Sequence, residues 1–290
     1  MTMFEQVFFS GLALGSIYGL VALGFAVIFK ATDVFNFAQG MFVVCGAYFA
    51  VTAMSILQLP FPLAIVFIVG AAALLGVLIH MVLIQPLSGR PMLSVIMLTI
   101  ALSISLRSII EMVFGPQGRS LTTPLPTGVL MLGSVRISYL HLTAALVSWV
   151  CMAGFGLFFK FTSVGLLMRA SADNHEAAVV SGVNVNTMNR LAWGIGSTLA
   201  AVGGLFLGQL QIASTELEGI GLLALPAVVI GGMQSIPGAI VGGLLVGIIE
   251  QMASTYISPK SSDIVIYVLL LLILMVRPWG LFGQRELGRV

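Results

Sequence analysis

The chain has 290 residues, of which 59% are hydrophobic and only 8% are charged, and its formal net charge is +2. Because a water-soluble domain carries roughly 25% charged residues, this composition excludes a soluble globular protein. The small net charge and the lack of a basic run in the sequence give no indication of nucleic-acid binding.

Nine apolar segments follow one another along the chain, and each is a candidate membrane helix. They are continuously apolar rather than alternating, which excludes a transmembrane β-barrel. The α-helix then satisfies every backbone polar group in lipid. The predicted fold is an all-α polytopic membrane bundle, a single domain over residues 1–290 with about eight or nine transmembrane segments. The segments cover residues 7–29, 40–57, 62–84, 92–113, 140–160, 191–210, 221–233, 236–257 and 264–276.

Two regions interrupt this pattern. Polar side chains break the apolar sequence over residues 31–41. Residues 221–233 would span only about 20 Å as a helix, less than the ~30 Å hydrocarbon core. Non-helical backbone at membrane depth is tolerated only where protein buries it or a water-filled cavity faces it. Both regions are therefore candidates for a pathway through the membrane.

The distribution of lysine and arginine predicts the orientation, because basic residues concentrate in short cytoplasmic loops. With a cytoplasmic C-terminus and nine spans, the basic residues on the cytoplasmic side are Lys30, Arg90, Lys160, Arg169, Arg190, Arg277, Arg285 and Arg289. Only Arg119, Arg136 and Lys260 lie outside. We therefore expect a periplasmic N-terminus and a cytoplasmic loop over residues 161–190. If either short segment does not cross, the part of the chain before it changes sides.

Few ionisable residues lie inside the apolar segments, and each has a structural explanation. Arg107 and Glu111 are expected to form an ion pair on one helix face. We expect Glu250 to hydrogen bond to a neighbouring helix and His80 to lie at a membrane interface. The histidines do not cluster as metal ligands, so we expect no metal and no cofactor.

Glycine recurs every fourth residue in two of the apolar segments. Gly11, Gly15 and Gly19 lie in the first segment, and Gly243 and Gly247 lie near the end of the chain. Small residues at this spacing let helix backbones approach closely in lipid. We expect tight helix packing at both places.

The loop over residues 161–190 contains a short predicted helix at about 172–182. Asp173 followed by Glu176 resembles a capping box. Gly182 stands where a helix commonly ends in the left-handed conformation. Because an isolated helix of this length is marginal in water, we expect it to dock on another molecule.

This loop also resembles a known signature. Glu176-Ala177-Ala178 followed by Gly182 is similar to the first half of the EAA signature of bacterial ABC importer permeases, and the second half is absent. In that family a short cytoplasmic helix seats in a groove of the ATPase subunit. The sequence contains no G-x-x-x-x-G-K-[ST] P-loop, so ATP must be hydrolysed by another subunit. The resemblance implies coupling through Asp173, Asn174, Glu176, Ala177, Ala178, Gly182 and Val183.

Similarity to LivH-type branched-chain amino acid permeases, of the LivH/LivM family, extends over nearly the whole chain. Residues 15–24 with 36–40, residues 231–243 with Glu250, and residues 277–283 carry it. Family members usually have histidine where Gln39 stands.

The resemblance implies a multi-pass permease subunit of the bacterial inner membrane that is not an enzyme and that translocates branched-chain or related small amino acids. Its implied partners are a LivM-like second permease subunit, two ATP-binding subunits, a periplasmic substrate-binding protein and the lipid bilayer, with no nucleic acid. Uncharged hydrogen-bonding side chains suit the passage of a zwitterion. The expected pathway residues are Asn36, Gln39, Thr99 and Ser103.

Several alternatives stay open on the sequence. A urea, amide or aromatic-acid permease of the same superfamily would share these motifs. A stand-alone secondary transporter or channel would transport without an ATPase. A structural membrane protein fits poorly with polar residues at membrane depth. The permease could pair with a second copy of itself or with a different subunit.

Overall fold

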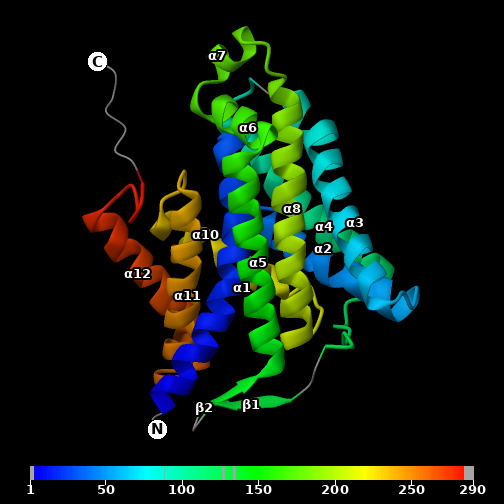
Figure 1. Cartoon of the computed structure of the whole chain (residues 1–290), viewed down its shortest axis with the longest axis vertical. Helices are drawn as coiled ribbons and strands as arrows, with labels where there is room; N and C mark the ends of the chain where they lie inside the picture. The colour runs from blue at the N-terminus through cyan, green and yellow to red at the C-terminus, as the bar shows by residue number, and fades with distance from the viewer. Residues whose placement is uncertain (1–2, 88, 126–127, 133–134, 284–290) are drawn as a thin grey trace.

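The computed structural model describes residues 3–87, 89–125, 128–132 and 135–283, and it is a bundle of helices (Figure 1). Seven helices in this described part are long and apolar enough to cross a membrane. They are α1 (Met3–Thr32), α2 with η1 (Gln39–Ile56), α3 with η2 and η3 (Phe61–Leu87), α4 (Met92–Phe114), α5 (Tyr139–Phe161), α8 (Val185–Leu210) and α11 (Ile236–Tyr256). The shorter apolar helices are α9 with α10 (Leu217–Gly231) and α12 (Ser262–Val276). The predicted all-α membrane bundle is confirmed.

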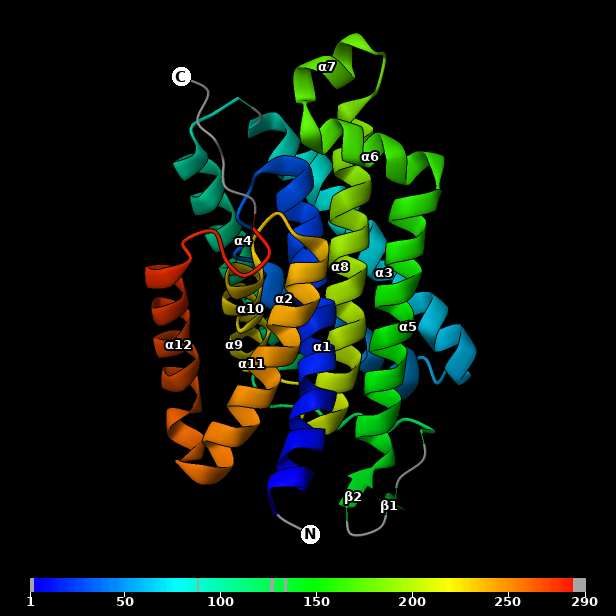
Figure 2. The same cartoon turned by 60° about the vertical axis from the view of Figure 1, so that its left-hand side comes forward.

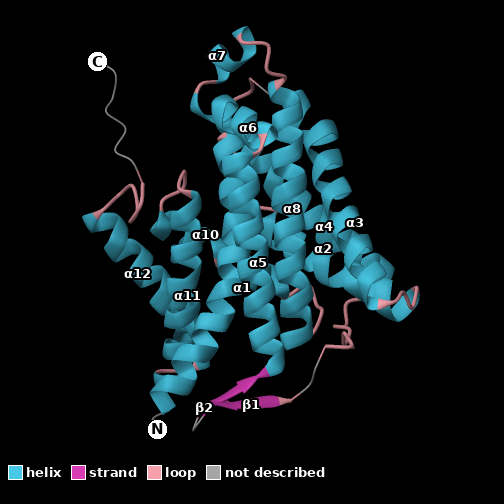
Figure 3. Ribbon diagram, in the orientation of Figure 1, coloured by secondary structure: helices cyan, strands magenta, loops and turns pink. Residues whose placement is uncertain are grey.

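The two ends of the bundle carry different connections, as Figures 2 and 3 show. One end, the α7 end, carries α6 (Ser163–Asp173) and α7 (His175–Val180). The opposite end, the hairpin end, carries the start of α1 and the antiparallel strands β1 (Val129–Leu132) and β2 (Val135–Ser138). These strands were not predicted from the sequence, because four residues are too few for an alternating pattern to be recognised.

Helix α1 is buried over most of its length, and its packing depends on glycine. A Cβ on Gly247 of α11 would lie 2.2 Å from the Cα of Gly15. A Cβ on Gly243 would lie 2.3 Å from the Cα of Gly19. Backbones at this separation leave no room for a side chain. The predicted tight packing is confirmed, and the two glycine stretches pack against each other.

The chain breaks between α1 and α2, inside the bundle. Residues 33–38 are not helical, and Asp33 has a φ of 51°. The side-chain amide of Gln39, the first residue of α2, donates to the carbonyl of Val21 at 3.3 Å. Val21 lies about three turns before the end of α1. Segment 33–38 therefore runs back along α1, and the predicted interruption of the apolar pattern is confirmed.

A second short helical region packs on this break. α9 (Leu217–Leu222) and α10 (Ala224–Gly231) follow each other closely, and the region begins before the predicted segment 221–233. A Cβ on Gly40 would lie 2.5 Å from the carbonyl oxygen of Glu218, so α9 contacts the start of α2 directly.

The stretch after α12 completes α10. The backbone N–H groups of Leu281 and Phe282 donate to the carbonyls of Ile230 and Gly231 at 2.8 and 2.9 Å. The last carbonyls of a helix have no partner within that helix, so these bonds satisfy the end of α10. Two stretches that carry the family resemblance, 231–243 and 277–283, therefore meet here.

We expect Gly247→Ala to destabilise the protein, with Gly154→Ala on α5 as the matched control. The new Cβ at 247 would overlap the backbone of α1, whereas a Cβ at 154 meets nothing within 4 Å. Overpacking costs about 1–3 kcal/mol, and alanine otherwise favours a helix over glycine. Thermal unfolding in detergent should show a lower midpoint for Gly247→Ala alone. Unchanged midpoints for both variants would contradict the packing.

Candidate functional site

Asn36 and Gln39 hold the segment between α1 and α2. The side-chain amide of Asn36 donates to the side-chain oxygen of Gln39 at 3.1 Å. The side-chain oxygen of Asn36 accepts from the backbone N–H of Ala38, also at 3.1 Å. Both side chains are buried. With the bond from Gln39 to Val21, they tie the segment to α1 and satisfy part of its backbone.

Thr99 ties the same segment to α4. Its hydroxyl oxygen lies 3.3 Å from the carbonyl oxygen of Phe35 and 3.3 Å from the backbone nitrogen of Phe37. It also lies 2.8 Å from the carbonyl oxygen of Ile96 in its own helix. A hydroxyl has one proton and two lone pairs, so it can accept from Phe37 while it donates to one carbonyl. Three of the four predicted pathway residues therefore meet around this segment.

A row of polar side chains continues along the same face of α4 toward the hairpin end. Ser103, Arg107 and Glu111 recur at the spacing that places helix residues above one another. Ser103 donates a short hydrogen bond to the carboxylate of Glu218 on α9. Arg107 contacts Glu111 at 3.0 Å and Glu218 at 3.6 Å. We call this set the polar ladder: Thr99, Ser103, Arg107, Glu111, Glu218 and Thr215, whose hydroxyl donates to Glu111.

The α9 side of the ladder was not predicted from the sequence. Glu218 and Thr215 precede the predicted short segment, where polar residues are ordinary. The expected pair of Arg107 and Glu111 is confirmed, but Glu218 gives Arg107 a second carboxylate from another helix. The available signal was an acid at the entrance to an apolar segment too short to cross. Because these side chains are partly exposed, their ion pairs contribute little to stability and can exchange at small cost.

Two other ionisable residues, Glu250 and His80, lie inside the apolar segments. The expectation that Glu250 hydrogen bonds to a neighbouring helix stays a prediction, because one of its carboxylate oxygens is buried without a hydrogen-bond partner in the described part of the chain. The expectation that His80 lies at a membrane interface stays a prediction, since its burial among helices does not give its depth in the membrane. His80 is only 2% exposed, and its ring centroid lies 6.1 Å from that of Trp193 on α8, which covers this end of α3. Among the described residues, no group of three or more His, Cys, Asp or Glu could hold a metal ion.

Helix α7 forms the tip of the α7 end (Figure 2) and is shorter than the predicted helix at 172–182. The expected capping box at Asp173 is wrong, because α6 extends through Asp173 and Asn174 is the N-cap of α7. The side-chain oxygen of Asn174 accepts from the backbone N–H of Ala177 at 2.9 Å. Two consecutive helices share this junction, which the sequence alone did not indicate.

The end of α7 agrees with the prediction. Gly182 has a φ of +83°, in the left-handed region. Its N–H donates to the carbonyl of Val179, and the N–H of Val183 donates to the carbonyl of Ala178, both at 3.0 Å. This Schellman pattern satisfies the last carbonyls of the helix.

The outer surface of α7 carries two exposed valines beside the exposed polar side chains of His175 and Glu176. Val180 is 89% exposed, and Val179 is also exposed. Ala178 is only 5% exposed and packs within its own chain, and its role in coupling stays a prediction. Clustered exposed apolar side chains mark contact sites for other proteins. The other predicted coupling residues are exposed or half-buried, and they are Asp173, Asn174, Glu176, Ala177, Gly182 and Val183.

Basic residues divide between the two ends of the bundle. Those at the α7 end are Lys30, Arg90, Lys160, Arg169 and Arg190. Those at the hairpin end are Arg119, Arg136 and, by its backbone position after α11, Lys260. Arg277 follows α12, and Arg285 and Arg289 lie outside the described residues. This division agrees with the one that the predicted orientation requires.

Spanning helices, an internal break and a polar ladder together form the architecture of a multi-pass membrane transport protein. The family model described as the permease component of branched-chain amino acid transport systems matches residues 7–274. The chain belongs to this family of permeases, which are not enzymes.

Curated relatives are similar over nearly their full length. The chain is 30% identical to the high-affinity branched-chain amino acid transport system permease protein LivH of Escherichia coli strain K12, over 99% of this chain and 98% of that one. It is 31% identical to BraD of Pseudomonas aeruginosa, with 98% and 97% covered. It is 26% identical to a probable LivH of Methanocaldococcus jannaschii, with 91% and 88% covered. The predicted LivH-type resemblance and the multi-pass inner-membrane location are confirmed.

We expect Glu218→Gln to slow transport with little effect on thermal stability. The variant removes the anionic acceptor of Ser103 and the second carboxylate beside Arg107, groups that are partly exposed. Initial uptake rates should fall about fivefold or more, equivalent to ~1 kcal/mol in the barrier. Glu216→Gln, an exposed acid two positions earlier, is the control. If both variants take up substrate as fast as the unchanged protein, the polar ladder is not part of the pathway.

Proposed function

We propose that the chain is a permease subunit of a bacterial ABC importer that translocates branched-chain or related small amino acids. Family membership and the branched-chain amino acid transport for which its relatives are named support this substrate class. The observation that carries the ATP-driven mechanism is α7, a capped helix with exposed valines at the tip of the bundle. Separate ATP-binding subunits hydrolyse ATP, because the sequence has no P-loop.

The α7 end is the cytoplasmic end in this proposal. The division of basic residues between the ends supports it. The N-terminus and the β-hairpin then face the periplasm, where a substrate-binding protein delivers the amino acid. The C-terminal stretch 277–283 lies on the cytoplasmic side.

Coupling runs through α7 and α6 into the bundle. Val179 and Val180 seat in a groove of the ATPase subunit, and the Asn174 cap and the Gly182 turn keep α7 rigid under load. α6 contacts α1, α5 and α8. A displacement of α7 therefore reaches the spanning helices directly.

The polar ladder and segment 33–38 form the protein's side of the pathway. A zwitterion that enters from the periplasm meets Arg107 and Glu218, which can exchange their mutual contact for its carboxylate and ammonium groups. Asn36, Gln39 and Thr99 hold segment 33–38 in place. This segment closes the pathway beyond the polar ladder. Rocking of the bundle shifts this segment and gives alternating access. A LivM-like second permease subunit closes the open side of the pathway.

We expect Gly182→Val to uncouple the transporter and Gly182→Asn to preserve coupling. A β-branched residue is strained at the φ of +83°, whereas asparagine tolerates the left-handed region. Substrate-stimulated ATP hydrolysis by the reconstituted complex should fall about tenfold or more for valine, equivalent to ~1.4 kcal/mol. Full hydrolysis with Gly182→Val would contradict the coupling role.

Val180→Asp should weaken co-purification of the ATP-binding subunits, because it places a charge beside the exposed Val179 at the tip of α7. Gln117→Asp, an exposed position at the hairpin end, is the control and should leave co-purification unchanged. If both variants retain the ATP-binding subunits, these subunits dock on a surface other than α7.

Orientation is tested by labelling introduced cysteines. Ala177→Cys and Gln117→Cys are exposed at opposite ends; the native Cys45 is buried, and the half-buried Cys151 is replaced by serine in both variants. A membrane-impermeant maleimide should label Gln117→Cys on intact spheroplasts and Ala177→Cys only after permeabilisation. The reverse pattern would invert the proposed topology.

A further inference from the structure

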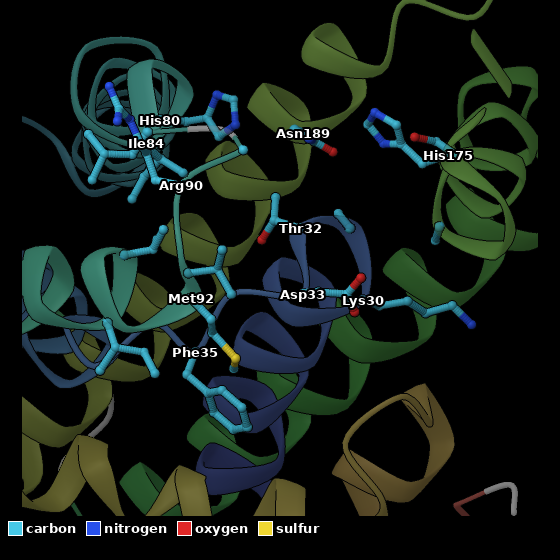
Figure 4. A pocket seen from close by; sticks show the side chains of 18 of the residues that line it. Lys30, Thr32, Asp33, Phe35, His80, Ile84, Arg90, Met92, His175 and Asn189 are labelled. Carbon is cyan, nitrogen blue, oxygen red and sulfur yellow. The ribbon is translucent and has the colours of Figure 1, made fainter. Parts of the chain in front are cut away.

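A cavity of about 600 Å³ lies at the α7 end (Figure 4). The end of α1, the connection between α3 and α4, the α6–α7 junction and α8 line it. Phe35 of the broken segment lies at one side of this space, and Asn189 and His175 lie at the opposite side. The cavity thus joins the segment that blocks the pathway to the helices proposed to receive the ATPase.

Three polar atoms around this cavity have no hydrogen-bond partner within the described part of the chain. They are Nδ1 of His80, the hydroxyl of Ser171 and the side-chain oxygen of Asn189. His80 is only 2% exposed and Ser171 only 5%. A buried polar group without a partner costs about 1–3 kcal/mol, and proteins rarely leave one. These atoms come from three separate elements, η2 (His80–Ile84), α6 and α8, and all three residues line the one cavity.

The other lining groups indicate which kind of molecule would fit the cavity. Lys30 and Arg90 bring two positive charges, and Asp33 and Asp173 bring two negative charges. This balance fits a zwitterion better than an anion or a cation. The apolar side chains that complete the wall are Phe35, Ile84 and Val95. A small amino acid with an apolar side chain matches both features.

We propose that this cavity binds the released amino acid from the cytoplasmic side and that its occupation slows the transport cycle. The inference rests on the proposed function for the identity of the ligand. A bound amino acid bridges Ser171 on α6, Asn189 on α8 and His80 on α3. α6 must move relative to α3 and α8 when α7 is displaced. A ligand that binds one arrangement of these helices more tightly shifts the population toward it and delays the next cycle.

The test uses the complete transporter complex in nanodiscs, without the binding protein. Binding of radiolabelled leucine is measured directly, with glutamate, lysine and urea as competitors. We expect saturable leucine binding that these competitors do not displace, and inhibition of ATP hydrolysis over the same concentration range. Ser171→Ala and Asn189→Ala should each raise the leucine Kd about fivefold, the effect of one hydrogen bond of ~1 kcal/mol.

Ser148→Ala is the matched control. Its hydroxyl on α5 is also buried without a hydrogen-bond partner in the described chain, but it does not line the cavity. It should leave leucine binding unchanged. No saturable binding, equal loss in Ser148→Ala, or binding that both cavity variants retain would overturn the inference.

Uptake with the binding protein is measured separately, so the two proposals fail independently. Leucine uptake without product-side binding would refute the cavity site and leave the proposed function standing. Cavity-dependent binding of leucine without uptake of any branched-chain amino acid would refute the proposed function and retain the site.

Discussion

A backbone polar group inside a lipid-embedded bundle must find its partner within the protein, and the break between α1 and α2 makes this constraint concrete. The chain leaves α1, runs back along it without helical hydrogen bonds, and resumes as α2 near the middle of α1. Side chains of Asn36, Gln39 and Thr99 supply bonds that the missing helix would have made. The polar residues at this depth are therefore a structural requirement of the break. The segment can move only if these hydrogen bonds are exchanged for others. It is therefore suited to act as a barrier that has a few distinct positions.

The rest of the bundle gives that barrier a rigid frame. Glycine contacts between α1 and α11 fix the two backbones together, because neither helix can shift without opening a gap or a clash. By contrast, Arg107 joins α4 to Glu218 of α9 through an ion pair that is partly exposed and exchanges at small cost, although Thr99 and Ser103 are buried. Rigid apolar packing on one side of the segment and an exchangeable ion pair on the other favour motion of α4 and α9 relative to α1.

Most of the fold was predictable from the sequence because lipid imposes a simple rule on hydropathy. Each of the apolar segments is helical, and glycine spacing identified the closest packing. The pathway candidates Asn36, Gln39 and Thr99 also lie together. Contacts between distant elements were not predictable: Glu218 reaches Ser103 only because α9 packs on α2. Helix α6 extends through Asp173, so this residue does not cap the next helix, and α8 covers His80. Neither effect can be recognised from the local sequence pattern.

The backbone bonds from Leu281 and Phe282 to the end of α10 have a consequence for biosynthesis. The carbonyls of Ile230 and Gly231 receive these partners from a stretch that is synthesised about fifty residues later, beyond α11 and α12. During translation the end of α10 must therefore depend on water or on temporary partners. α10 reaches its final state only when the last helix has been inserted. A ribosome that stops before residue 281 therefore releases a bundle in which the last carbonyls of α10 lack these partners.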